Sequence, residues 1–516
     1  MHHPGNATQD HLPAQNRAAN RFTAGAQYIA GRLTHGSSDR TYTVVDPATG
    51  TPVLTYRLAT PADVDAAVAA ARAAFPAWSA ATPAERSDAL HRFAAVLADH
   101  AEELARAESL QCGKPLKLTR EFDVPGTVDN AAFFAGAARH LQGQSAGEYS
   151  ADHTSYVRRE PLGVIGSVAP WNYPLQMAAW KILPAIAAGN TVVLKPAENT
   201  PLTALMFAQA ATEAGIPDGV INIVSGTGRE AGEHLVGHPD VAMTSFTGST
   251  AVGERVARTA TATLKRLHLE LGGKAPFLVF DDADPEAAAH GAVAAALINS
   301  GQDCTAATRA YVQRPRYEEF VDRTAALMRT VRLGDPFAPG TDLGPLVSHA
   351  HRDRVAGFVD RARTYARVVT GGEIPDDAHL KDGAYYRPTL IVDAAQDSEA
   401  VQAEIFGPVL VVLPFDTDDE GIDLANDTPY GLAASAWTRD VYRAHRATRE
   451  IKAGCVWVND HIPIISEMPH GGYKASGFGK DMSAYSFEEY TQLKHVMFDN
   501  TAAPAKDWHR TVFGDR

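Results

Sequence analysis

The sequence predicts an α/β fold with two lobes, for three reasons. At 516 residues, the chain is long enough for about three average domains or for one large two-lobed protein. Its first half alternates short apolar runs with helical stretches, which is typical of crossover units around a parallel sheet. The apolar runs are continuous rather than alternating, as expected for strands that helices cover on both faces. We therefore expect a doubly wound, nucleotide-binding lobe and a second α/β lobe.

The first lobe is expected to begin with helices. Thr60 and Thr82 are N-cap candidates, because each is followed by Pro and then by an acid three residues on. We expect helices of about 16 and 25 residues there, and a third over about 122–141. The apolar runs that follow are 163–168, 191–195, 219–224, 241–246, 267–271 and 276–280. Helices are expected between the first four runs and after the fourth, at 175–188, 201–214, 229–237 and beyond Gly248.

The second half of the chain repeats the mixture of helices and strands without repeating the sequence. No internal repeat of 20–50 residues is visible. The expected helices are at about 285–299, 317–331 and 351–365. The expected strands are near 387–392, 408–413 and 455–458. A second α/β lobe is the simplest interpretation.

Composition excludes several classes of protein. Lys and Arg number 47 against 61 Asp and Glu, so the formal net charge is −14. This argues against a nucleic-acid partner, which requires clustered cations, and leaves a cationic small molecule open. Three cysteines cannot form a disulfide framework, so we expect a reducing, cytoplasmic location. The uncharged run 161–180 contains three prolines, and we expect a strand, a loop and a helix there rather than a membrane span.

Two glycine clusters follow predicted strands, where a dinucleotide would bind. Residues 226–232 have one residue too many for the G-x-G-x-x-G pattern, and residues 248–253 do not match it either. Each cluster is equally explained as a tight turn. Lys195 and Glu198 follow the apolar run 191–195 and suit ribose hydroxyls, although a solvated strand end explains them as well.

Three cysteines are candidate nucleophiles. Cys112 and Cys455 adjoin apolar segments and are expected to pack as small hydrophobes. Cys304 lies in a polar, glycine-bearing break after an apolar helix. We expect a further helix to follow, whose N-terminus would lower the pKa of this thiol. The local sequence leaves catalytic and structural roles for Cys304 both open.

Two carboxylates and one amide complete the set of candidates. Glu270 lies within an apolar strand, where its charge is costly unless it is functional, salt-bridged or at an edge. Glu404 is the second carboxylate. Asn172 can donate hydrogen bonds to an oxyanion, although an isolated Asn is commonly only a turn residue.

Six motifs together resemble the aldehyde dehydrogenase superfamily, in its order and spacing, over about residues 25–498. They are PWNYP (170–174), KPAE (195–198), FTGS (246–249), LELGGK (269–274), GQDC (301–304) and EIFGPV (404–409). Four further stretches are similar to the γ-aminobutyraldehyde dehydrogenases. They are FFAGAARHLQG (133–143), GEYSADHTSYVRREPLG (147–163), GQDCTAA (301–307) and SEMPHGG (466–472). Betaine-aldehyde and other ω-amino-aldehyde enzymes are similar neighbours of that branch.

The resemblance implies a role for each catalytic candidate. Cys304 would attack the aldehyde as a thiolate, and Asn172 with the Cys304 backbone N–H would hold the oxyanion. Glu270 would be the general base that hydrolyses the thioester, so a free acid is expected rather than a CoA ester. The implied cofactor is NAD, with Lys195 and Glu198 on its ribose and no metal. The other implied cofactor residues are Pro170, Trp171, Gly228, Gly248, Ser249, Leu271, Glu404 and Phe406.

The resemblance also implies a substrate tunnel. Its expected lining residues are Asp303, Trp180, Ile464 and His470. An acid at Asp303 is associated with a cationic amino group, although this Asp equally caps a helix at Thr305. Trp180 equally packs in the core. Asp123 and Asp129 are expected to be solvated.

The implied domains are an NAD-binding domain (23–146 and 164–280), a catalytic domain (281–485) and an oligomerisation arm (147–163 and 486–500). Tails are expected at 1–22, disordered, and at 501–516. Within the arm, residues 148–159 and 486–496 match segments that pair between subunits, commonly in a dimer of dimers. We therefore expect a homo-oligomer.

Competing functions remain open on the sequence alone. A betaine-aldehyde or other aliphatic aldehyde dehydrogenase is the enzymatic alternative. A non-catalytic NAD-binding protein of the same fold belongs to a different class, and the intact set of Cys304, Glu270 and Asn172 argues against it. A Cys/His/Asn hydrolase would need a His near Cys304 and no cofactor.

Overall fold

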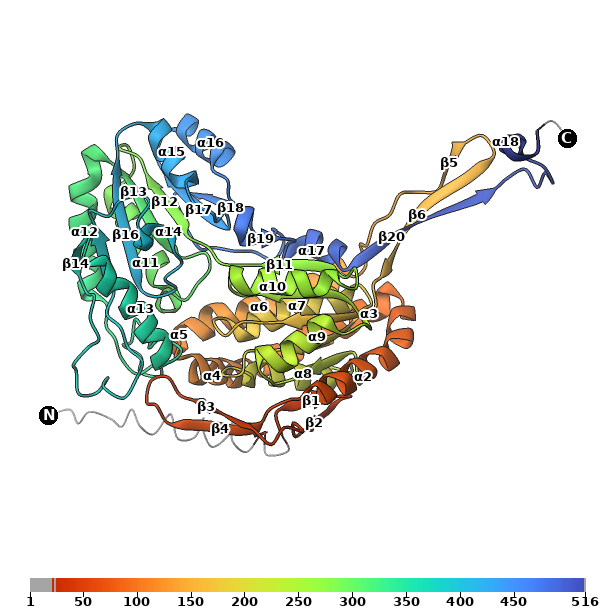
Figure 1. The fold of residues 1–516 in the computed structure, drawn as a ribbon, viewed down its shortest axis with the longest axis horizontal. Helices are drawn as coiled ribbons and strands as arrows, with labels where there is room; N and C mark the ends of the chain where they lie inside the picture. The colour runs from red at the N-terminus through yellow and green to blue at the C-terminus, as the bar shows by residue number, and fades with distance from the viewer. Residues whose placement is uncertain (1–20, 23–24, 515–516) are drawn as a thin grey trace.

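A computed structural model describes residues 21–22 and 25–514 of the chain. It consists of two sheet-centred lobes and a long arm that projects away from them (Figure 1). The expected fold class, a doubly wound lobe with a second α/β lobe, is confirmed. Among the described residues, no helix combines the length and apolar character needed to cross a membrane. The run 161–180 instead forms the end of one strand, a second strand and half a helix.

The first lobe is built on an eight-stranded sheet with the order β19-β11-β10-β7-β8-β9-β1-β2. Its five central strands are parallel, and the edge strands β19, β1 and β2 are antiparallel to their neighbours. The strands are β1 (Gln27–Ile29), β2 (Arg32–Thr34), β7 (Val164–Val168), β8 (Thr191–Lys195), β9 (Ile221–Ile223), β10 (Val241–Thr247), β11 (Arg266–Glu270) and β19 (Gly477–Phe478). A separate hairpin joins β3 (Thr41–Val45) to β4 (Pro52–Arg57).

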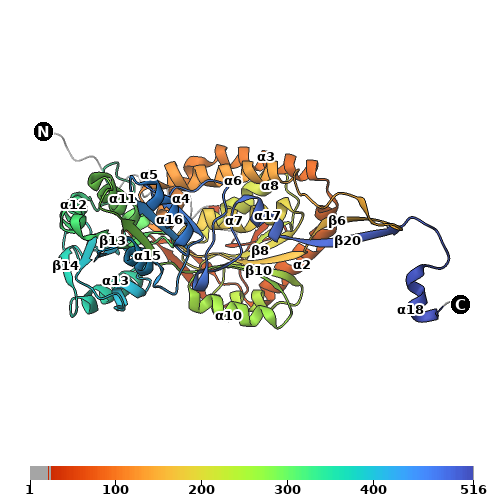
Figure 2. The ribbon, with the colours of Figure 1, turned by 90° about the horizontal axis from the view of Figure 1, so that it is seen from above.

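Helices cover both faces of this sheet (Figure 2). One face carries α2 (Pro61–Ala80), α9 (Glu233–Gly237) and α10 (Thr250–Thr261). The other carries α7 (Pro174–Ala187) and α8 (Leu202–Glu213), with a further layer outside them. That layer contains α3 (Pro83–Asp99), α4 (Ala101–Cys112), α5 (Leu116–Leu118), the π-helix η1 (Thr119–Asp123) and α6 (Val124–Ala137). A second π-helix, η2 (Gly228–Gly232), precedes α9.

The expected N-caps are present, and one expected helix is divided. The Thr82 backbone N–H donates to Glu85 Oε2 at 2.7 Å, while Thr82 Oγ1 accepts from the Glu85 N–H, so α3 begins with a capping box. The helix of about 25 residues expected from this point is two helices, α3 and α4. They are interrupted at His100, whose ψ of 9° leaves the helical range.

The second lobe contains a seven-stranded sheet with the order β14-β15-β16-β13-β12-β17-β18. The strands are β12 (Ala275–Val279), β13 (Ala307–Gln313), β14 (Arg367–Thr370), β15 (Thr389–Val392), β16 (Val409–Phe415), β17 (Ala433–Trp437) and β18 (Cys455–Val458). Its helices are α11 (Pro285–Leu297), α12 (Tyr317–Thr330), α13 (His349–Ala362), α14 (Glu399–Gln402), α15 (Asp418–Asn426) and α16 (Val441–Glu450). The 3₁₀ turns of this half of the chain are η3 (Ile298–Gly301), η4 (Arg314–Arg316) and η5 (Lys474–Ser476).

The position of β12 corrects the expected domain boundary at residue 280. This strand was expected to end the first lobe, but it lies inside the second sheet, between β13 and β17. The chain therefore crosses between the lobes at residues 271–274, immediately after β11. The sequence cannot separate the two cases, because β11 and β12 are both short, buried parallel strands.

The arm is a three-stranded antiparallel sheet. It contains β5 (Gly147–Ser150), β6 (His153–Pro161) and β20 (Thr491–Asp499), in the order β20-β6-β5. The helix α17 (Ser483–Glu489) leads into β20, and the tail beyond it forms η6 (Asp507–His509) and α18 (Arg510–Phe513). Residues 1–20 of the predicted disordered tail lie outside the described part of the chain. Phe22, which was included in that tail, is buried, so the tail ends earlier than expected.

Candidate active site

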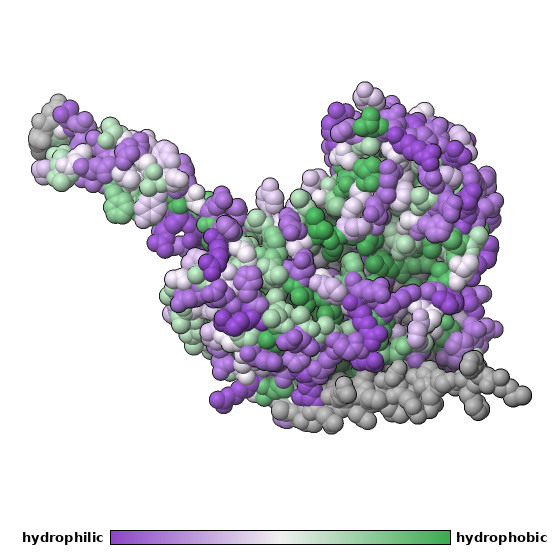
Figure 3. Space-filling view, turned by 180° about the vertical axis from the view of Figure 1, so that it is seen from behind, coloured by the Kyte–Doolittle hydropathy of each residue, from purple (hydrophilic) through white to green (hydrophobic). Residues whose placement is uncertain are grey.

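A cavity of about 420 Å³ lies where the two lobes meet. Hydrophobic surface is visible in the hollow between the arm and the second lobe (Figure 3). The cavity brings together all the predicted site residues except Lys195, Glu198 and Gly228. Those that line it are Pro170, Trp171, Asn172, Trp180, Gly248, Ser249, Glu270, Leu271, Asp303, Cys304, Glu404, Phe406, Ile464 and His470.

Side-chain amides fix the turn that carries Cys304. Asn172 Nδ2 donates to the Gln302 carbonyl at 3.1 Å, and Asn299 Nδ2 donates to the same oxygen at 3.2 Å. Gln302 in turn donates through Nε2 to the Asn299 carbonyl at 3.0 Å. Asn299 and Ser300 have φ values of 48° and 57°, so these contacts hold a left-handed backbone at the turn. The Asn172 amide therefore lies beside the loop of the candidate nucleophile.

The surroundings of Cys304 differ from the expectation in one respect. The residues that follow it form a turn and then the strand β13, so the helix that was expected to begin after Cys304 is not formed. Burial raises the pKa of the Cys304 thiol well above its usual value, and the carboxylates of Asp303 and Glu270 add to the rise. The predicted lowering of this pKa is therefore wrong for the protein without ligands. Cys304 nevertheless lines the cavity, and the residue as a whole is partly exposed.

The other two cysteines lie away from the cavity. Cys112 is buried at the end of α4, with Sγ 3.6 Å from the Trp171 carbonyl. Cys455 begins β18, and burial raises its pKa to about 11. Both positions agree with the expected packing roles.

Glu270 ends β11 and is buried at the cavity wall. Neither of its carboxylate oxygens has a hydrogen-bond partner among the described residues. A Cβ at Gly471, which has a φ of +153°, would lie 2.4 Å from Glu270 Oε1. Glycine at that position therefore makes room for the carboxylate. The sequence also allowed Glu270 to lie at the edge of a sheet. This expectation is partly correct, because only the two-residue strand β19 lies outside β11.

Several cofactor candidates, such as Ser249 and Leu271, follow the carboxyl ends of parallel strands, whereas Glu404 and Phe406 lie between α14 and β16. Ser249 is the N-cap residue of α10, directly after β10, and Thr247 Oγ1 beside it is buried without a hydrogen-bond partner in the described structure. Glu404 Oε1 accepts from the Gly273 N–H at 2.8 Å, and burial raises the pKa of Glu404. The Phe406 ring lies 5.3 Å from the Trp171 ring. An unpaired hydroxyl beside a helix N-terminus at the sheet edge suits the pyrophosphate of a dinucleotide.

The remaining three cofactor candidates form a group outside the cavity lining. Lys195 ends β8, and its Nζ lies 3.0 Å from Glu198 Oε2. Gly228 begins η2, and a Cβ built there meets no atom within 4 Å. The expectation of a solvated strand end is wrong for Lys195, which is buried. A buried lysine and a partly exposed carboxylate at this strand end fit ribose hydroxyls.

Asp303 meets both of its expected interpretations. Its Oδ1 accepts from the backbone N–H and the hydroxyl of Thr305, each at 2.7 Å, so it caps a turn rather than a helix. Its Oδ2 accepts from the Tyr173 hydroxyl at 2.8 Å. The same side chain lines the cavity, so its negative charge lies beside the space that a substrate enters.

The other tunnel candidates form one wall. Trp180 is buried, donates from Nε1 to Asn130 Oδ1 at 2.7 Å, and lines the cavity as well, so it too serves both expected roles. The His470 ring lies 5.1 Å from the Trp180 ring. Ile464 completes this wall.

The structure corrects the expectation for Asp123. This side chain is buried and pairs with Lys114 Nζ at 2.6 Å, and burial raises its pKa to about 7. Asp129 is exposed, as expected, and accepts from the Ser466 hydroxyl. It lines an outer cavity of about 280 Å³ that shares Phe122, Trp180 and Ile464 with the main one.

Sequence reasoning missed several residues of the site. Lining residues that it did not single out include Phe122, Gln176, Met177, Thr247, His351, Arg354, Ile462 and Asp481. His268 was also missed, although a signal existed. It lies two residues before Glu270, and residues two apart on a strand point to the same face.

Comparison with known proteins agrees with this geometry. Residues 33–496 match the model of the aldehyde dehydrogenase family. PnpE, solved in complex with nicotinamide adenine dinucleotide, is 41% identical with a TM-score of 0.92, over 95% of this chain and 100% of that chain. Staphylococcus aureus betaine aldehyde dehydrogenase, in complex with NAD+, is 35% identical with a TM-score of 0.92, over 96% of this chain and 99% of that chain. A Bacillus cereus aldehyde dehydrogenase, also with NAD+, is 39% identical with a TM-score of 0.90, over 93% of this chain and 98% of that chain. The chain therefore belongs to the aldehyde dehydrogenase family.

Proposed function

We propose that this protein is an NAD-dependent dehydrogenase of ω-amino aldehydes, which converts 4-aminobutanal to 4-aminobutanoate. The observation that carries the proposal is the charge of the aldehyde entrance. The outer cavity has two charged lining residues among those described, Glu121 and Asp129, and both are acids. Asp303 adds a third acid further in. A path lined by acids and aromatic rings favours an ammonium group over a neutral or anionic chain end.

The side chains provide a complete set of groups for the oxidation. Cys304 loses its thiol proton to solvent, its thiolate Sγ bonds to the aldehyde carbon, and the C=O π electrons move onto the oxygen, which becomes an oxyanion. Asn172 donates to this oxyanion from its side-chain amide. In the second stage Glu270 takes a proton from water, the water oxygen bonds to the acyl carbon, and the carbon–sulfur bond breaks. The acid leaves, and the thiolate of Cys304 is restored.

The cofactor belongs to the same proposal. When bound, NAD accepts the hydride that the substrate carbon loses. Lys195 and Glu198 would hold a ribose, and a carboxylate at Glu198 disfavours the 2′-phosphate of NADP. The residues that would hold the rest of the cofactor are Pro170, Trp171, Gly228, Gly248, Ser249, Leu271, Glu404 and Phe406.

A panel of aldehydes with NAD and NADP tests the substrate and cofactor together. We expect kcat/KM for 4-aminobutanal to exceed that for butanal by about tenfold, equivalent to about 1.4 kcal/mol. Betaine aldehyde is the necessary second cation, because betaine aldehyde dehydrogenases are among the similar structures and the aromatic rings suit a quaternary ammonium. A preference for butanal would overturn the cationic substrate. Turnover in Cys304→Ala would overturn the chemistry.

We also propose that the arm assembles the chain into a dimer of dimers. Leu493, Met497 and Phe498 on β20 are each more than half exposed in the single chain. Large apolar side chains on an open strand are a surface that another chain would cover. Sedimentation equilibrium measures the assembly, and a monomer at micromolar concentration would contradict it.

A further inference from the structure

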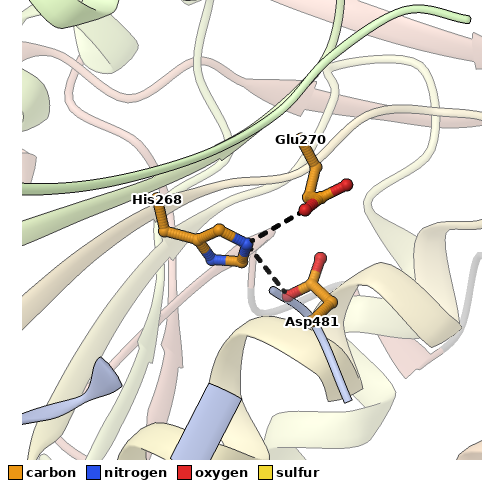
Figure 4. Close-up of side chains that lie close together, drawn as sticks. All are labelled: His268, Glu270 and Asp481. Atoms are coloured by element: carbon orange, nitrogen blue, oxygen red, sulfur yellow. Dashed lines mark ion pairs between the residues drawn. The ribbon is translucent and has the colours of Figure 1, made fainter. Parts of the chain in front are cut away.

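A buried histidine lies next to the proposed general base and takes no part in the chemistry described so far. His268 and Glu270 extend from the same face of β11, and Asp481 approaches them from the segment between β19 and α17 (Figure 4). His268 Nε2 lies 3.5 Å from Glu270 Oε1 and 3.8 Å from Asp481 Oδ1. All three side chains are buried.

The far side of the imidazole is anchored. His268 Nδ1 lies 3.0 Å from the Ser245 hydroxyl, which also accepts from the Tyr490 hydroxyl at 3.2 Å. A Cβ at Gly479 would lie 2.4 Å from His268 Cδ2, so the backbone packs directly against the ring. These contacts fix the ring with Nε2 directed at the two carboxylates.

The charges around this ring do not balance without it. Lys181 Nζ pairs with Asp481 Oδ2 at 2.8 Å, which compensates one of the two carboxylates. His470 Nδ1 lies 3.7 Å from Glu270 Oε2, and Glu489 approaches the far edge of His268 near Gly479. The Glu270 oxygens accept no hydrogen bond from a described residue. A buried carboxylate without a hydrogen bond or a counter-charge is strongly disfavoured, so the unpaired charge of Glu270 needs a cation.

Asp481 lies among the cationic side chains of this cluster. Burial raises the pKa of Asp481, but the nearby Lys181 and His268 outweigh it, so this pKa lies below its usual value. Lys181 therefore compensates Asp481, and the imidazole nearer to Glu270 is that of His268, at 3.5 Å against 3.7 Å for His470.

We propose that His268 is a positioning residue for Glu270, whose imidazolium holds the Glu270 side chain as a carboxylate directed at the cavity. This inference rests on the proposed role of Glu270 as general base. The proton taken from the hydrolytic water goes to Glu270 and not to His268. The expected consequence is specific, because formation of the acyl-enzyme uses Cys304 and Asn172, whereas its hydrolysis uses Glu270.

The test separates these two stages with 4-nitrophenyl acetate, which acylates a thiolate without aldehyde or cofactor. Release of 4-nitrophenolate measures acylation, and intact-mass spectrometry follows the decay of the acetyl-enzyme. His268→Phe keeps a buried ring without charge, and His268→Gln keeps an uncharged donor. Tyr490→Phe is the matched control, because it removes a buried hydroxyl from the anchored side of the imidazole.

We expect both His268 variants to acylate within about twofold of the wild type and to lose the acetyl group about tenfold more slowly. The acidic limb of the decay rate should also move to higher pH, because removal of a cation favours the protonated carboxyl. Tyr490→Phe should change both stages by less than about twofold.

Three results would overturn the inference. One is decay at the wild-type rate in either His268 variant. Another is an equal loss of acylation and decay, which indicates a general structural defect. The third is loss of the decay step on treatment with EDTA, because the three side chains would then be holding a metal ion. A failure of the proposed function gives a different result. If Glu270 is not the general base, Glu270→Gln loses the acetyl group at the wild-type rate, whatever the His268 variants do.

Discussion

Two clusters of buried charge in the first lobe differ in how completely the glutamate carboxylate of each is hydrogen-bonded. In the Lys114 cluster (Glu108, Lys114 and Asp123), Lys114 lies 2.6 Å from Asp123 and 3.6 Å from Glu108. Both oxygens of Glu108 accept further hydrogen bonds, from Gln111, Thr203 and the Leu175 backbone. In the Glu270 cluster (Lys181, His268, Glu270 and Asp481), both oxygens of Glu270 lack such partners among the described residues.

We infer that this difference separates a group that holds the fold from one that serves as the proposed general base. Glu108 is fixed by four neighbours and has no remaining capacity for a substrate or for water. Glu270 lines the cavity, and its unpaired oxygens can accept a proton from water there. Buried polar atoms are normally paired, so an unpaired carboxylate at a cavity wall is itself a sign of function. The comparison predicts opposite consequences for mutation of the two clusters.

The largest effect is expected from Glu270→Gln. Loss of the general base should slow decay of the acetyl-enzyme by about 10²–10⁴, while the melting temperature stays near that of the wild type. The amide keeps the size of the carboxylate and removes a buried charge. Stopped-flow spectroscopy and intact-mass measurements follow the reaction, and calorimetry follows stability. A variant with a much lower melting temperature that still hydrolyses the acetyl-enzyme at the wild-type rate would contradict this comparison.

Lys114→Met should show the reverse pattern. Two buried acids would lose their cation, and breaking a buried pair costs about 3–5 kcal/mol of unfolding free energy. Urea denaturation measures this loss. Lys117→Met is the control, because Lys117 pairs with Asp342 at an exposed site, where a loss within about 1 kcal/mol is expected. If both variants lose the same unfolding free energy, the buried cluster contributes no more to stability than an exposed ion pair.

The thiols beside the two clusters should respond differently to alkylation. Cys112 is buried next to the Lys114 cluster, whereas Cys304 reaches the cavity. Burial and nearby carboxylates raise the pKa of Cys304, so its thiolate fraction grows with pH without reaching a plateau. Iodoacetamide should therefore modify Cys304 and leave Cys112 intact in the folded protein, and its reaction with Cys304 should be about a hundredfold faster at pH 9 than at pH 7. Peptide mapping identifies the modified residue. A rate that is flat above pH 7 would mean that the thiol is already ionised.

Much of this organisation follows from the sequence. The strand–helix alternation predicted the first sheet, because buried parallel strands are continuous apolar runs, and the Thr-Pro-x-acid patterns predicted two helix starts. The motifs around Cys304, Glu270 and Asn172 predicted residues that the fold brings to one cavity. These signals are local, and they are read directly from neighbouring residues.

The features that were missed have different causes. Asp123 was expected to be solvated, because its pairing with Lys114 is fixed only when η1 folds against α4. The environment of Cys304 was misjudged because a turn and a strand, rather than a helix, follow it. Lys181 and Asp481 are 300 residues apart, and nothing near either one indicates the other. The approach of distant segments is what the sequence alone does not contain.

The smallest effect is expected at the entrance, where a charge acts through solvent rather than in a buried cluster. Asp129→Asn keeps a group that accepts from Ser466 and removes one negative charge from the outer cavity. We expect kcat/KM for 4-aminobutanal to fall about two- to threefold at low salt, with butanal unchanged and the difference lost at high ionic strength. Asp88→Asn is the control, because Asp88 is also exposed but pairs with Arg139 away from both cavities. An equal loss for butanal would mean that Asp129 shapes the entrance, and the attraction of a cation would then depend on Glu121 and Asp303.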